Sequence, residues 1–196
     1  MSQVNVQVSA VGAGQMIVEA ALELMVENGF AAMSMRSLAK KVGLHAGSLY
    51  HHFPSKLDVL EEVLDSLLQQ RLDDWWARKP KRVDVLKLLD AFIAFHIQHV
   101  LEHSREEHLV HLETHHLHGP QLSRIQEQGE AYIHELSEII RRGVKAGLFK
   151  APDVDLVARS LLAMLSAAPS LCAVGVSRAS ITQMLTRMAK QLLWVH

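Results

Sequence analysis

Acidic residues are missing from one long stretch of an otherwise balanced sequence. The 196 residues carry 21 Asp and Glu against 20 Lys and Arg, for a formal net charge of −1, so the molecule as a whole is not a generic binder of polyanions. Between Glu27 and Asp58 there is no Asp or Glu at all. The basic residues of that stretch are Arg36, Lys40, Lys41 and Lys56. Any contact with nucleic acid must come from this locally basic surface, which is of the kind that phosphate groups need.

Cysteine and long apolar runs are also scarce. Cys172 is the only cysteine, which excludes an intrachain disulfide and any CxxC motif and fits a reducing compartment. Residues 1–13 lack the charged start and apolar run of a signal peptide and are expected to form a flexible tail. No apolar run is expected to approach the roughly 20 residues needed to cross a bilayer. We therefore expect a cytoplasmic protein that does not contact a membrane.

Catalytic motifs are missing as well. The sequence has no GxSxG, no glycine-rich phosphate loop, no HExxH and no nucleophile beside an evident base. Cys172 lies within an apolar run and is expected to be an inert packing residue. We expect that the chain is not an enzyme and carries no cofactor.

Strand-like alternation is absent beyond a few residues, whereas helical periodicity runs through the chain. Ser104 and Glu107 are expected to form a capping box at the start of one helix. Helices are expected over residues 15–28, 34–43, 45–52, 57–76, 83–103, 105–117, 120–146, 154–172 and 180–195. We predict an all-α protein with a tail at residues 1–13, a helix-turn-helix head at 14–56 and a larger helical domain at 57–196.

The segment from Ser34 to Lys56 reads as two short helices joined by a tight turn. Ser34 can cap the first helix, and Gly43 stands where a left-handed residue would end it. The second helix, roughly His45 to His52, offers small, hydrogen-bonding and aromatic groups and no carboxylate, so it can enter a major groove. A helix pair that merely packs is the alternative, because two short helices and a turn are common.

The sequence GFAAMSMRSLAKKVGLHAGSLYHHFPSKLDVL, residues 29–60, resembles the DNA-binding signature of the TetR family of transcriptional regulators. The similarity covers roughly residues 11–71, and the rest of the chain fits the family in length and helical pattern only. The resemblance implies an N-terminal three-helix DNA-binding head and a larger C-terminal helical domain for ligand binding and dimerisation. Residues 57–76 would then connect the head to that domain.

The resemblance also implies which side chains contact DNA. The aromatic residue of the LYxHF run, Tyr50, and the lysine of the SK pair, Lys56, are expected to contact phosphates. Ser34 and Arg36 open the first helix of the motif, where backbone contacts are favoured. The expected DNA-binding residues are Ser34, Arg36, His45, Ala46, Gly47, Ser48, Tyr50, His51, His52 and Lys56, of which residues 45–48 are expected to read bases. Capping or packing is the alternative role for each.

The histidines gather between His96 and His118, and two readings of them remain open. His111 and His115 are four residues apart, a spacing that puts two imidazoles on one helix face and could bind zinc, nickel or copper. Alternatively, the histidines line a ligand cavity inside a helix bundle; no metal is favoured. The residues expected at a mostly apolar ligand with a polar or anionic group, such as an acyl-CoA or a lipid metabolite, are Trp75, Trp76, Phe92, Phe95, His96, His99, His115 and Met164.

The last two expected helices, residues 154–172 and 180–195, are apolar on more than one face, so we predict a homodimer through them. The resemblance implies that such a dimer binds a pseudo-palindromic double-stranded DNA operator, with recognition helices about 34 Å apart. An effector of unknown identity would move residues 57–76 and release the DNA. The alternatives are a metal-sensing regulator that uses the cluster from His96 to His118 and a small-molecule-binding module that does not bind DNA. The resemblance to the family favours a repressor. The sequence itself does not distinguish repression from activation.

Overall fold

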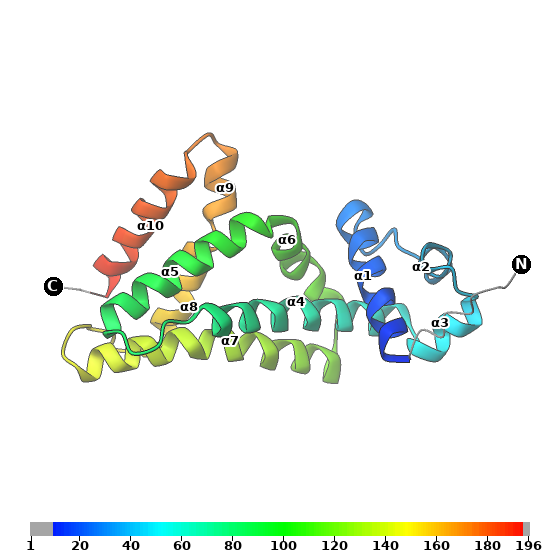
Figure 1. Cartoon of the computed structure of the whole chain (residues 1–196), viewed down its shortest axis with the longest axis horizontal. Coiled ribbons are helices and arrows are strands. Elements are labelled where there is room, and N and C mark those ends of the chain that lie inside the picture. The colour runs from blue at the N-terminus through cyan, green and yellow to red at the C-terminus, as the bar shows by residue number, and fades with distance from the viewer. Residues whose placement is uncertain (1–9, 194–196) are drawn as a thin grey trace, which may run out of the picture. The chain divides into compact units, whose positions relative to one another are not determined.

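The computed structural model describes residues 10–193, and every regular element in that range is a helix (Figure 1). The elements are α1 (Ala10–Asn28), α2 (Met35–Val42), α3 (Ala46–His52), α4 (Lys56–Arg78), α5 (Val85–Glu102), α6 (Ser104–Glu113), the 3-10 turn η1 (Thr114–His116), α7 (Gly119–Lys145), α8 (Val154–Leu165), α9 (Ala168–Ala173) and α10 (Arg178–Leu192). The all-α prediction is confirmed.

Several expected helix boundaries differ from those in the structure. Helix α1 starts at Ala10, so residues 10–13 of the expected tail are helical, while residues 1–9 lie outside the described residues. The expected helix over 105–117 ends at Glu113 and continues as a 3-10 turn. The expected helix over 154–172 is interrupted after Leu165, because Pro169 stands at the start of α9, where its missing N–H favours a new helix.

Residues 10–67 and 108–125 form one compact unit. In it α1 packs against α2, and α2 packs against α3. Figure 1 shows these three helices in blue and cyan. The interior is made of apolar residues at helical spacing, with Ile17, Met25, Leu38 and Leu49 essentially inaccessible. Besides the expected helix-turn-helix head, this unit therefore contains the first half of α4, most of α6 and the start of α7.

Residues 68–107 and 126–193 form the second compact unit. Helix α5 packs against α8, α9 and α10, and its buried side chains supply much of the core. At the end of α7 the ring of Phe149 lies where a Cβ atom on residue 143 would be, so that position requires the glycine it has. Of the helical domain expected at residues 57–196, this unit contains 68–107 and 126–193, whereas 57–67 and 108–125 belong to the first unit.

The run from Val154 to Ala173 is long and apolar enough, by length and composition alone, to cross a membrane. This corrects the expectation that no apolar run approaches that length. In the structure the run is broken between α8 and α9 and carries Asp155 and Arg159. Only 28% of it is buried inside the described chain, so it leaves an apolar surface open.

Candidate DNA-binding surface and effector site

The helix-turn-helix forms through local hydrogen bonds that the sequence predicted. The hydroxyl of Ser34 accepts the backbone N–H of Ser37 at 3.0 Å, and the hydroxyl of Ser37 accepts the N–H of Ser34 at 3.0 Å. Gly43 adopts the left-handed conformation, with φ of 70°, and its N–H caps the end of α2. Both predicted caps are confirmed, and together they fix the turn that presents α3.

Helix α3 exposes nearly all of its side chains. Leu49 is its one buried residue and anchors it to the head, whereas the ring of Tyr50 is 50% exposed. The imidazole of His45 does not cap the helix. The expected base-reading and flanking residues of this segment, His45, Ala46, Gly47, Ser48, His51 and His52, are all exposed. An arrangement with one anchor and an open polar face suits a helix that docks into a groove.

A hollow of about 510 Å³ brings the expected backbone contacts together. Its lining includes Ser34 and Arg36 at the start of α2, Ala46 and Tyr50 on α3, and Lys56 at the start of α4. No carboxylate lines it. The guanidinium of Arg36 is exposed and has no ion-pair partner among residues 10–193. The hollow thus offers hydroxyl, phenol and cationic donors to one anionic group, as phosphate recognition requires.

Lys56 has a second set of contacts that the sequence did not predict. Its ammonium donates to the backbone carbonyl of Ala31 at 3.1 Å and lies 4.2 Å from the centre of the Phe30 ring. Burial lowers the pKa of Lys56, against the opposing effect of the Glu113 carboxylate. The lysine therefore contacts the turn between α1 and α2 and also lines the hollow.

A string of polar side chains crosses the core of the second unit. His96, 1% exposed, lies between the hydroxyl of Tyr132, 3.2 Å from Nδ1, and the hydroxyl of Ser166, 3.1 Å from Nε2. The Glu107 carboxylate accepts two hydrogen bonds from Arg71, at 3.0 and 3.1 Å. The Arg71 guanidinium also lies 4.6 Å from the centre of the Tyr132 ring, which connects the two groups of contacts.

The environment sets the charges in this string. Burial, helped by the positive charge of Arg71, lowers the pKa of His96 to about 3, so this imidazole is neutral at physiological pH. Burial alone would raise the pKa of Glu107, but the hydrogen bond from His99 and the charge of Arg71 lower it to about 2. His99 Nε2 is 3.3 Å from this carboxylate. The core thus holds one neutral imidazole beside one arginine–glutamate ion pair.

Aromatic rings surround the string. Trp75 packs edge-on against Phe92 with ring centres 4.9 Å apart, and Phe92 lies 5.2 Å from Tyr132. Trp75 and Phe95 are 5.5 Å apart. The indole N–H of Trp75 donates to Glu135 at 2.8 Å.

Five of the eight expected ligand residues therefore lie in one place: Trp75, Phe92, Phe95, His96 and His99. Met164 is half-buried against the same core. Trp76 is 50% exposed on the surface, and His115 is exposed in the other compact unit, so neither lies in this cluster.

Sequence reasoning missed four members of the cluster: Arg71, Glu107, Tyr132 and Ser166. The expected capping box at Ser104–Glu107 is wrong, because the Glu107 side chain bonds Arg71 and His99 instead of the helix start. A buried partner 36 residues away leaves no signal in local spacing. The one available sign was an acidic residue two positions before the apolar Leu109.

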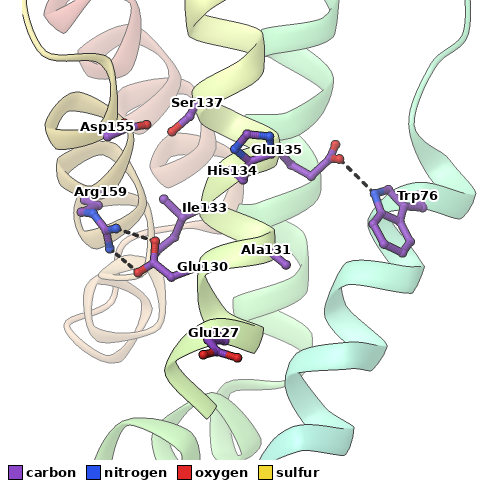
Figure 2. Close-up of a pocket in the computed structure, with 10 residues that line it drawn as sticks. All are labelled: Trp76, Glu127, Glu130, Ala131, Ile133, His134, Glu135, Ser137, Asp155 and Arg159. Carbon is purple, nitrogen blue, oxygen red and sulfur yellow. Dashed lines mark hydrogen bonds and ion pairs between the residues drawn. The ribbon is translucent and has the colours of Figure 1, made fainter. Parts of the chain in front are cut away.

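A groove of about 530 Å³ follows the outer face of α7, where Figure 2 shows Trp76 on one side and Arg159 on the other. Its lining holds the carboxylates of Glu127, Glu130, Glu135 and Asp155. Most of that charge is already paired: Arg159 bonds Glu130 at 2.7 and 2.5 Å, and Glu135 accepts from Trp76 at 3.0 Å. Lys79 also bonds Glu135. Asp155 lies 3.5 Å from Arg141, so three of the four carboxylates are engaged by neighbouring side chains.

The expected histidine pair for a metal does not form on one helix face. His111 is on α6, but that helix ends at Glu113, and His115 follows in η1 with its Nδ1 against the carbonyl oxygen of Leu112. Among the described residues no three His, Cys, Asp or Glu side chains are grouped to hold a metal ion.

Comparisons with known proteins agree with this arrangement. The family described as bacterial regulatory proteins of the tetR family matches residues 17–63, and the tetracyclin repressor-like C-terminal domain matches residues 84–170. The transcriptional repressor KstR2 of Mycobacterium tuberculosis is 30% identical over 149 residues, which cover 73% of this chain and 72% of that protein.

Two solved structures share the fold. A tetR-family regulatory protein from Rhodococcus RHA1 superposes with a TM-score of 0.83 at 16% identity, covering 96% of this chain and 100% of its own. FadR of Bacillus subtilis, solved with stearoyl-CoA, gives a TM-score of 0.76 at 18% identity over 89% of this chain and 96% of its own. The capped helix-turn-helix, the helical second unit and these matches together show that the chain belongs to the TetR family of DNA-binding transcriptional regulators.

Proposed function

We propose that this chain is a dimeric, cytoplasmic repressor that leaves a pseudo-palindromic operator when a mostly apolar small molecule with a polar or anionic group binds its C-terminal unit. The observation that carries the DNA-binding part is the open, carboxylate-free surface made by α2, α3 and Lys56. Tyr50, Lys56, Ser34 and Arg36 contact phosphates in this proposal, and residues 45–48 read bases.

The effector binds at the polar string in the core. Buried polar groups cost free energy even when they are bonded, so a helix bundle built only for stability would favour apolar residues there. A string of donors beside Trp75, Phe92 and Phe95 supports recognition of a ligand that is apolar along most of its length. An acyl-CoA fits this chemistry: its acyl chain would lie among the rings, and its carbonyl or anionic end near Arg71 and His96. The related fold of FadR, solved with stearoyl-CoA, supports this class.

The energetic requirement on the effector is modest. A ligand moves a two-state protein only by binding one state more tightly than the other. If the effector binds the released shape about 10⁴-fold more tightly than the DNA-bound shape, a difference of about 5.5 kcal/mol, nearly all molecules move from the DNA-bound shape to the released shape. Burying a single acyl chain among aromatic rings supplies free energy of that size, and it becomes a preference only to the extent that the chain is buried in the released shape and not in the DNA-bound shape.

The dimer forms through the open apolar surface of the last helices. Helix α10 exposes Met184, Met188 and Leu192, and Leu156 of α8 is 61% exposed. Sedimentation tests this: changing Met184 and Met188 to lysine should give a monomer, while Met16→Lys, a similarly exposed methionine on α1, should leave the dimer intact. A double variant that sediments like the unchanged chain contradicts this interface.

The function is tested in two steps. Duplexes selected from a random pool by the full chain should contain an inverted repeat. Their release and the protein's melting temperature are then followed with coenzyme A, fatty acids and acyl-CoAs of increasing length. We expect a response that grows with acyl length and that falls about fivefold in Ser166→Ala, which loses a hydroxyl bonded to His96 at the C-terminal cap of α8. Ser160→Ala, inside α8, should leave the response unchanged.

Two outcomes support the alternatives instead. Stabilisation by zinc, nickel or copper that vanishes when His111 and His115 are both alanine would indicate a metal sensor. Absence of any selected duplex would indicate a small-molecule-binding module that does not act on DNA.

A further inference from the structure

The groove along the outer face of α7 contains a hydroxyl group that the protein leaves without a partner. Ser137 lines this groove and is 1% exposed, and its Oγ has no hydrogen-bond partner within residues 10–193. Leaving a buried hydroxyl unpaired costs free energy, so such a group marks a place where a ligand atom can bind. Figure 2 shows Ser137 on the same length of helix as the carboxylates of the groove.

Carboxylates follow the groove over about three turns of α7. Glu127, Glu130 and Glu135 come from that helix, and Asp155 comes from the start of α8 (Figure 2). Glu127 lies ten residues before Ser137, which is about 15 Å along the axis of an α-helix. Among the described residues no three possible ligands are grouped to hold a metal ion. The negative charge is therefore spread along a length that suits an extended molecule.

The carboxylates of Glu127 and Glu130 are open to a cation from solvent. Glu127 is exposed and has no ion-pair partner among the described residues. Glu130 is paired with Arg159, but the two side chains are 49% and 48% exposed. Ion pairs as exposed as this one contribute little free energy, so the ammonium group of a ligand can replace the guanidinium.

Trp76 adds an aromatic face beside a third carboxylate. Its indole ring is 50% exposed, and its N–H donates to Glu135 at 3.0 Å, which holds the ring next to that carboxylate. Lys79 donates to Glu135 at 2.6 Å, so this carboxylate already binds one ammonium group. Burial alone would raise the pKa of Glu135, but the hydrogen bonds from Lys79 and Trp76 lower it. A charged carboxylate beside an open indole face attracts ammonium groups.

We propose that this groove binds an aliphatic polyamine, a linear chain of ammonium groups joined by methylene segments. The carboxylates that line the groove accept its N–H groups, and the Ser137 hydroxyl accepts one more. Its methylene segments lie against Ala131 and Ile133, the apolar side chains of the lining. The groove shares no lining residue with the buried cluster around His96, and the inference does not rest on the operator or the effector proposed above.

Calorimetric titration of the full chain with spermidine, in the absence of DNA, tests the site. We expect saturable binding that is weakened about threefold in Glu127→Gln, the size expected for one exposed ion pair. Trp76→Leu removes the aromatic face and should weaken binding about fivefold. Glu102→Gln is the matched control, because it removes an exposed carboxylate of α5 outside the groove, and it should bind as the unchanged chain does.

Two results of this titration would overturn the proposal. The first is the absence of saturable binding. The second is equal weakening in Glu127→Gln and Glu102→Gln, since spermidine would then respond only to the net charge of the chain.

Ser137→Ala separates contact with the ligand from support of the fold. Because the Ser137 Oγ bonds nothing in the described chain, its removal should leave the melting temperature unchanged or raise it. Spermidine affinity should nevertheless fall about threefold, the loss expected for one hydrogen bond. Unchanged affinity in both Ser137→Ala and Glu127→Gln would contradict the proposed site.

NMR spectra of the unchanged chain locate the ligand without relying on any variant. Spermidine should shift the indole N–H signal of Trp76 and the amide signals of residues 127–137, and it should leave the amide signals of α3 in place. Mg²⁺ at the same ionic strength should not displace spermidine, because diffuse screening does not depend on the shape of the cation. Shifts confined to other helices, or full displacement by Mg²⁺, would overturn the assignment of a polyamine to this groove.

Discussion

The two compact units handle their polar groups in opposite ways. In the helix-turn-helix, Ser34 and Ser37 bond each other's backbone three residues apart, and Tyr50 and Arg36 are left open to solvent. In the C-terminal unit, the buried His96 bonds the buried Tyr132, 36 residues away, and the exposed Ser166, 70 residues away. The local contacts of the helix-turn-helix leave an exposed surface on α2 and α3. The long-range contacts of the C-terminal unit instead join side chains of several helices to one another.

The largest effect should come from separating the half-buried Arg71–Glu107 ion pair. In Glu107→Leu the Arg71 guanidinium, which is 12% exposed, loses its carboxylate partner, and we expect a loss of about 3 kcal/mol in the free energy of unfolding, measured in urea. Arg71→Met together with Glu107→Leu should cost less than the single change, since no charge is left unpaired. If Glu107→Leu is as stable as the double variant, the unpaired Arg71 charge has no cost, and the prediction is contradicted.

The second effect is a pH dependence confined to the core. The pKa of His96 is about 3 in the folded chain and 6.5 as a free side chain. Above pH 6.5 neither state binds the proton, so the group has no effect there. Between 6.5 and 3 only the unfolded chain binds it, and stability falls by about 1.4 kcal/mol per pH unit as the pH decreases.

Urea unfolding at pH 6.5 and 5 therefore separates two variants. His96→Gln should lose about 2 kcal/mol less than the unchanged chain over this interval. His51→Gln, at an exposed position of α3, should follow the unchanged chain. Parallel pH curves for all three proteins would remove the distinction between the buried and the exposed imidazole.

A smaller effect is expected at the local caps of the head. Ser34→Ala removes the acceptor for the Ser37 N–H, and the loss of an N-cap costs about 1 kcal/mol. Thermal unfolding measures it. The matched change Ser123→Ala, at an exposed position of α7, should cost a few tenths at most. An equal cost at both positions would mean that the cap does not organise the turn.

These differences explain what the sequence could predict. Ser34, Gly43 and the anchor at Leu49 follow from spacing within a few residues, so the head was predicted closely. The aromatic and histidine side of the core was also predicted, because Phe92, His96 and His99 share one face of α5. Glu107 was assigned to a cap instead, since its partner Arg71 is on another helix and only the folded bundle brings the two together.

The smallest expected change in affinity belongs to one hydroxyl. Tyr50→Phe keeps the ring but removes a phosphate donor, so operator binding should weaken by about fivefold with an unchanged melting temperature. Anisotropy titration of both proteins on the same duplex measures it. The weakening should be similar for every duplex tested, because a phosphate contact carries no sequence information; a loss restricted to some sequences would instead make Tyr50 a base reader.

The salt dependence of operator affinity tests the DNA-binding claim most directly. The logarithm of the binding constant should fall linearly with the logarithm of salt concentration, and Arg36→Gln should make the slope shallower by about 0.9, as expected for one lost phosphate contact. Lys145→Gln, which removes an exposed charge from the C-terminal unit, should leave the slope unchanged. A slope that is the same for Arg36→Gln as for the unchanged chain, or affinity that does not depend on salt, would contradict the assignment of the acid-free surface to DNA.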